Sequence, residues 1–66
     1  MSTFDKSQAF VALSEVYEND EAAAILDTAD AGIAFTDELF VPDSRGVCRL
    51  EVSVTADRGA YTITWN

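Results

Sequence analysis

The sequence predicts a small α+β domain: two N-terminal helices packed on a small antiparallel β-meander of two to three strands that ends in a C-terminal hairpin. Two observations support this fold. Before Gly32, apolar residues recur with the spacing of helices, and after Gly32 they alternate with polar residues, as in strands. The chain of 66 residues has the size of one domain, residues 1–66, and its 48% hydrophobic content argues against disorder.

A first helix is predicted over residues 3–18. Ser2 or Thr3 can cap it, and Asp5 in its first turn suits the positive end of the helix dipole. One arc of about 120° is apolar and predicts the core side. This arc holds Ala9, Phe10, Leu13, Val16 and Tyr17, whereas Phe4 and Val11 form a smaller second strip.

A second helix is predicted over residues 20–31, capped by Asn19 or Asp20 and stopped at Gly32. Its predicted core face consists of Ala22, Ile25, Leu26 and Ala29, and Ile33 continues it. Asp20, Asp27 and Asp30 gather on a different face, roughly opposite the core. The short connection between the two helices favours a helical hairpin.

The C-terminal hairpin follows from alternation in "VCRLEVSVT" and "AYTITW", which are joined by the turn "ADRG". The stretch "ELFV" before "PDSRG" predicts a third strand, and "GIAF" is either a strand or the tail of the second helix. Cys48 shares the apolar side of its strand, which predicts a buried, inert thiol. A single cysteine also rules out an internal disulfide.

The residues that usually perform catalysis are missing from the sequence. No His is present, and the three glycines are too scattered to form a phosphate-binding loop. The segment "DTADAG" lacks the alternating ligands and the closing Glu of a calcium loop. Solvent-facing carboxylates would also keep ordinary pKa values. We therefore expect no enzyme activity, no cofactor and no metal site.

Charge is distributed unevenly along the chain. Residues 1–43 carry a net charge of −9 and residues 44–66 carry +1. Direct binding to nucleic acid or anionic lipid rests on Lys and Arg, so a charged partner should instead be basic. The three arginines lie near acids in the sequence and are interpreted as surface ion pairs; they are Arg45, Arg49 and Arg58, beside Asp43, Glu51 and Asp57.

The first ten residues do not have the pattern of a signal peptide, and the longest apolar run, "AAAIL", is too short to cross a bilayer. A soluble, cytoplasmic protein is therefore expected.

The stretch "EVYENDEAAAILDTAD", residues 15–30, contains six acids and no basic residue. Along the second helix, Asp20 and Asp27 would be about 10 Å apart, and Asp27 and Asp30 about 4–5 Å apart along the axis. Carboxylates spaced in this way resemble the charge density of a nucleic-acid backbone. We therefore expect the acids of this region to bind a partner. The candidate residues are Glu15, Glu18, Asp20, Glu21, Asp27, Asp30, Asp37 and Glu38.

In its size, its acidity and the acidic region of residues 15–38, the chain resembles the DNA-mimic inhibitors of phages and mobile elements, of the anti-CRISPR and anti-restriction type. The resemblance implies a non-enzymatic inhibitor that blocks the nucleic-acid-binding site of a basic protein, such as a CRISPR effector complex. Such an inhibitor, if phage-encoded, would act in the host cytoplasm.

Three alternatives stay open. The acids could be a solvated face, or an adaptation to a halophilic host. The chain could also be a structural or regulatory interaction module, antitoxin-like or an assembly subunit, that binds through apolar surface such as a hairpin edge. Both a monomer and a homodimer are compatible with so small a core.

Overall fold

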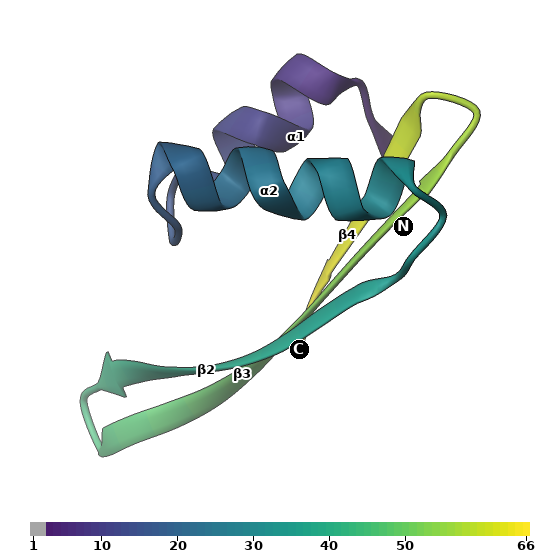
Figure 1. Ribbon diagram of the computed structural model, residues 1–66. Helices are drawn as coiled ribbons and strands as arrows, with labels where there is room; N and C mark the ends of the chain where they lie inside the picture. Colours follow the sequence, from purple (N-terminus) through teal and green to yellow (C-terminus); the bar gives the residue numbers. More distant parts are fainter. Residues whose placement is uncertain (1–2) are drawn as a thin grey trace.

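The computed structural model describes residues 3–66 as two helices lying on one face of a four-stranded antiparallel sheet (Figure 1). The strand order in the sheet is β1-β4-β3-β2. The elements are β1 (Thr3–Phe4), α1 (Lys6–Leu13), α2 (Asn19–Asp30), β2 (Phe35–Asp43), β3 (Gly46–Asp57) and β4 (Ala60–Trp65). The predicted α+β class, the C-terminal hairpin and the strand at "ELFV" are confirmed. The sheet has four strands rather than two or three, because β1 adds to the edge of β4.

The first helix begins later than predicted, at Lys6. Asp5 and Gln8 form a capping box: the Gln8 N–H donates to Asp5 Oδ1 over 2.8 Å, and the Asp5 N–H donates to Gln8 Oε1 over 3.1 Å. A cap at Thr3 is therefore wrong, since Thr3 pairs with Thr62 in the sheet. The alternative cap, Ser2, lies outside the described residues.

The same helix also ends earlier than predicted, at Leu13. The chain then makes one tight turn, in which the Tyr17 N–H donates to the Leu13 carbonyl over 2.9 Å. This turn carries Tyr17 toward the sheet, where its ring meets Phe35 edge-on at 6.2 Å between ring centroids. Val16, predicted on the core side, is consequently 43% exposed.

The second helix agrees closely with its predicted bounds, but its predicted cap at Asn19 or Asp20 is wrong, because Glu18 is the N-cap residue and forms a capping box with Glu21. Its end has two bonds typical of a Schellman motif: the Ile33 N–H donates to the Thr28 carbonyl, and the Gly32 N–H donates to the Ala29 carbonyl. Gly32 has φ +85°, a conformation that side chains disfavour, which explains why the helix stops there. Ile33 turns outward and is 60% exposed, so its prediction as a core residue is wrong. In the stretch "GIAF", for which a strand and a helix tail were both open, only Phe35 belongs to a strand, because β2 begins there.

The β3–β4 hairpin closes through Arg58 and Gly59, with φ values of +53° and +81°. Positive φ at both central residues is the hallmark of a type I′ turn, whose twist matches that of the flanking strands. This tight turn aligns Val54 with Ile63 and Ala56 with Tyr61 on the side that faces the helices.

The core lies between the helical layer and the β3–β4 half of the sheet. Alternation places one side of each strand under the helices. The second helix contributes the whole stripe predicted for it, whereas the first contributes only Ala9 and Leu13. Among residues 3–66, ten residues are buried: Ala9, Leu13, Ala22, Ile25, Leu26, Ala29, Val52, Val54, Tyr61 and Ile63. The opposite side of the sheet is the open face, where Thr55 lies opposite Thr62 and Ser53 opposite Thr64.

The β2–β3 hairpin extends well beyond the helices and β4, as a long ribbon (Figure 1). We call this part, residues 39–50, the arm. On its open face, Phe40 is 66% and Val47 is 70% exposed. Cys48 does share the apolar side of β3, but the helical layer does not cover it and the thiol is exposed. The prediction of a buried Cys48 is therefore wrong.

Candidate functional site

The structure separates the eight predicted partner-binding acids between the two sides of the sheet. Asp37 lies opposite Val52, a core residue, and therefore faces the helical side. Its neighbour Glu38 lies opposite Glu51 on the open face. The other six acids belong to α2 and to the turn before it. Seven of the eight are thus on the helical side, and Glu38 is separated from them by the sheet.

Asp20 and Asp27 lie on the outer face of α2. The buried residues of this helix, such as Ala22 and Leu26, face the sheet, and the helical repeat turns Asp20 and Asp27 away from it. The two acids are seven residues apart, or about 10 Å along the helix axis. Both are exposed, and within residues 3–66 neither takes part in an ion pair.

Three further acids surround the N-terminus of α2: Glu15, Glu18 and Glu21. The Glu18 N–H donates to Glu21 Oε1 over 3.4 Å, which places this carboxylate at the positive end of the helix dipole. All three are exposed, and none has a cationic partner in the described part of the chain. With Asp20 and Asp27, they make up the acidic helical surface.

Asp30 has a different environment, on the flank of α2 that faces α1 and β4. The Tyr61 hydroxyl donates to Asp30 Oδ1, and Lys6 Nζ lies 3.0 Å from Asp30 Oδ2. The hydrogen bond from Tyr61 and then the bond from Lys6 hold the pKa of Asp30 below its ordinary value. Asp30 therefore ties three elements together, and its charge is compensated.

This depressed pKa makes Asp30 a source of acid sensitivity. Its stabilising effect is present above the pKa of an unfolded Asp, about 4, and is lost as the pH falls through the lower folded pKa. We expect Asp30→Asn to lower the thermal midpoint at neutral pH and to flatten its decline below about pH 4. Thermal unfolding followed by circular dichroism between about pH 2 and pH 7 measures this. Asp27→Asn is the control, and an equal flattening in that variant would contradict the assignment.

Asp37 is hydrogen-bonded at the base of the arm. The Tyr17 hydroxyl donates to Asp37 Oδ2 over 2.8 Å, and the Glu38 N–H donates to Asp37 Oδ1 over 2.8 Å. Burial and then the bond to Asp37 raise the pKa of the Tyr17 hydroxyl, with Glu21 adding to the effect. The hydroxyl is therefore a donor at neutral pH.

A cleft of about 330 Å³ lies beside this bond, between α2 and β2. Its walls are largely apolar and aromatic, while two carboxylates stand among them. The lining residues are Tyr17, Glu21, Ala24, Ile25, Phe35 and Asp37. Apolar walls combined with carboxylates suit a long cationic side chain, whose stem is apolar and whose end is charged.

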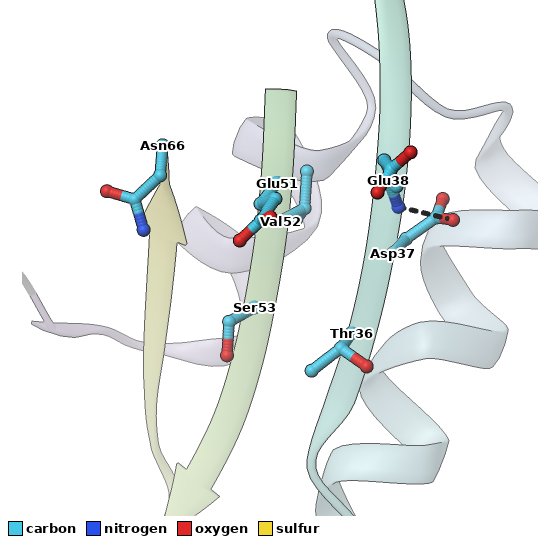
Figure 2. Close-up of a pocket in the computed structure, with 7 residues that line it drawn as sticks. All are labelled: Thr36, Asp37, Glu38, Glu51, Val52, Ser53 and Asn66. Carbon is cyan, nitrogen blue, oxygen red and sulfur yellow. Dashed lines mark hydrogen bonds between the residues drawn. The ribbon is translucent and has the colours of Figure 1, made fainter. Parts of the chain in front are cut away.

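The open face has a shallow hollow of about 430 Å³, with Thr36 and Ser53 on adjacent strands and Asn66 at one side (Figure 2). Glu38 and Glu51 lie directly opposite each other there. Arg49 pairs with both carboxylates, which leaves the three residues a net charge of −1: its Nη1 lies 3.4 Å from Glu38 Oε2, and its Nη2 contacts Glu51 Oε1. The sheet lies between this hollow and the acidic helical surface.

The interpretation of the arginines as surface ion pairs is confirmed for Arg49 with Glu51. Within residues 3–66, Arg45 and Arg58 form no ion pair. The sequence does not predict the hydrogen bonds of Tyr17 and Tyr61, because the apolar spacing around Tyr17 and the alternation in "AYTITW" indicate only which side of an element faces the core. The available signal was that a buried Tyr usually finds a hydrogen-bond partner for its hydroxyl.

Comparison of the chain with protein-family models, with curated proteins and with solved structures finds no match. Among residues 3–66, no three His, Cys, Asp or Glu side chains are grouped in a way that could hold a metal ion. No helix in this described range has the length and apolarity needed to span a membrane.

Proposed function

We propose that the chain is a non-enzymatic inhibitor that presents its acidic helical surface to the nucleic-acid-binding site of a basic protein, in place of DNA. A CRISPR effector complex in the cytoplasm of a host cell is one target of this kind. The observation that carries the proposal is that the ion-paired cations lie elsewhere: Lys6 is bound to Asp30, and Arg49 is bound on the open face. The acidic helical surface is therefore left with uncompensated charge.

The spacing of these charges supports the proposal. The twelve residues of α2 extend about 18 Å, a length over which one strand of a duplex carries about five phosphates. Residues 18–30 hold five acids, and four of them are uncompensated because Asp30 is bound by Lys6. A groove that neutralises the phosphates of one strand would thus meet a comparable number of carboxylates. Complementary fields of this kind accelerate association and exclude the competing nucleic acid.

Neutralising the outer face of α2 tests this function. We expect Asp20→Asn with Asp27→Asn to weaken inhibition about tenfold or more, because both charges would point into the basic groove. The measurement is the displacement of fluorescent DNA from a purified CRISPR effector complex or another basic DNA-binding protein, titrated with each variant. Both Asp side chains are exposed, so the fold should be unaffected.

The control is Asp43→Asn with Asp57→Asn, which removes the same charge at two hairpin turns, away from α2. We expect this variant to inhibit within about twofold of the original protein. Equal losses in both double variants would indicate a general charge effect and would contradict a specific acidic surface. Unchanged inhibition by the α2 variant would exclude the electrostatic mechanism.

A structural or regulatory interaction module is a second candidate, favoured by the arm. Phe40 and Val47 expose 66% and 70% of their area on the open face, and an exposed apolar patch commonly marks an interaction surface. An antitoxin-like protein or an assembly subunit would use such a patch. The complex would then be held together by apolar contact rather than by charge.

A further inference from the structure

The side of the arm that faces the helical layer is apolar and incompletely covered. Two cross-strand pairs lie on this side, Leu39 with Leu50 and Val41 with Cys48. Leu39 and Leu50 touch the edge of the core, whereas Val41 is half-buried and Cys48 is exposed. A two-stranded ribbon is marginally stable by itself in water, so this side of the arm would gain from a cover.

The arm differs in charge from the rest of the molecule. It carries a net charge of +1, while the rest of the chain carries −9, but one of its two cations, Arg49, is already paired with Glu38 and Glu51 on the open face. Arg45 stands in the turn at its tip and, within residues 3–66, forms no ion pair. The cleft at the base of the arm, in contrast, has the carboxylates of Glu21 and Asp37 among apolar walls. Arg45 is therefore complementary to the cleft, although Asp43 beside it carries the opposite charge.

An arm cannot reach the cleft of its own chain, because the ribbon runs away from the helices (Figure 1). We propose that a second copy of this chain is the occupant: two arms stack face to face and antiparallel, and each tip enters the cleft of the other copy. Contact between the acidic helical surfaces would bring like charges together. The arm is the part of the chain that a second copy can approach without this repulsion.

The register of the hairpin places the two-fold axis beside the Val41–Cys48 pair. Arg45 lies four positions after Val41 and Asp37 lies four positions before it. In an antiparallel stack, the tip of each arm therefore comes to the level of Asp37 in the other copy. Val41 and Cys48 then meet their counterparts across the axis, at the spacing of about 10 Å between packed sheets.

This arrangement leaves the outer face of α2 free, since Asp20 and Asp27 point away from the sheet. Of the acidic helical surface, self-association would cover Glu21, which lines the cleft. Self-association can be measured without any other protein. The arm is narrow, and interfaces below about 1,200 Å² are usually transient. We expect a dissociation constant on the order of 10 μM.

Sedimentation equilibrium of the full chain between about 1 μM and 500 μM tests the proposal. Val41→Asp is expected to raise the dissociation constant at least tenfold, because it places two carboxylates beside the axis. The control is Val47→Asp, on the open face of the same arm, which should associate like the original protein. A chain that stays monomeric throughout this range, or equal effects of the two variants, would overturn the proposal.

A second pair of variants decides the question if Val41→Asp fails to fold. Arg45→Glu reverses the charge that would enter the cleft and should weaken association about fivefold or more, whereas Arg58→Glu makes the same change at the other hairpin turn and should not.

A short bifunctional thiol reagent should also join two copies through Cys48. In Val47→Cys with Cys48→Ser, the thiol moves to the other side of the ribbon. Loss of cross-linking there supports the stacked arms, and equal cross-linking contradicts them.

Discussion

Leu26→Ala is expected to lower the free energy of unfolding by about 3 kcal/mol and to leave much of the chain unfolded at physiological temperature. Leu26 is 1% exposed and lies in α2 between the first helix and the sheet. The short side chain would leave a cavity that the small residues around it, such as Ala22 and Ala29, cannot fill. A core of ten buried residues has little stability in reserve.

Equilibrium unfolding in urea, followed by circular dichroism, measures this loss. Val11→Ala is the control: Val11 is also in a helix and also aliphatic, but it is 64% exposed, so we expect a change within about 0.5 kcal/mol. A loss below about 1 kcal/mol for Leu26→Ala would mean that the two layers do not pack around this residue.

Binding to a basic nucleic-acid-binding protein is expected to weaken by a factor of ten or more when salt rises from about 0.1 M to 1 M. Over this range the Debye length falls from about 10 Å to about 3 Å, so charges on the acidic helical surface would act only on groups in direct contact. Fluorescence anisotropy or calorimetry at a series of salt concentrations measures the slope. The variant with Asp20→Asn and Asp27→Asn should give a shallower slope, because fewer charges take part.

The salt series also separates the two candidate functions. A complex formed through the apolar arm would resist 1 M salt, since apolar association does not depend on screened charges. A flat dependence would therefore contradict DNA mimicry and favour an interaction module.

Much of the fold could be predicted because local signals agreed with the final packing. The stop at Gly32 and the stripe of Ala22, Ile25, Leu26 and Ala29 made α2 predictable, and strict alternation did the same for the C-terminal hairpin. The two-residue strand β1 could not be predicted, because Thr3 and Phe4 become a strand only by pairing with β4. Tertiary packing likewise ends α1 early, since Tyr17 turns to reach Phe35.

The candidate site was predictable in composition and less so in geometry. Asp37 and Glu38 are neighbours in the sequence and were therefore predicted to belong to one acidic surface. In a strand, however, adjacent residues point to opposite sides of the sheet. The sequence also could not show that Asp30 is bound by Tyr61 and Lys6, which are distant in sequence. Cys48 looked buried because alternation identifies a side of a strand but does not indicate how far the covering layer extends.

The pairing of β1 with β4 has a consequence for synthesis of the chain. Thr3 and Phe4 find their partners only in Thr62 and Tyr61, nearly the whole described length away. Closing so large a loop slows folding, and a ribosome releases the partner segment after the other strands of the sheet. While β4 is still in the exit tunnel, its place beside β3 is empty and the strand that carries Val52 and Val54 has one unprotected edge. The nascent chain therefore completes its sheet only after β4 has emerged.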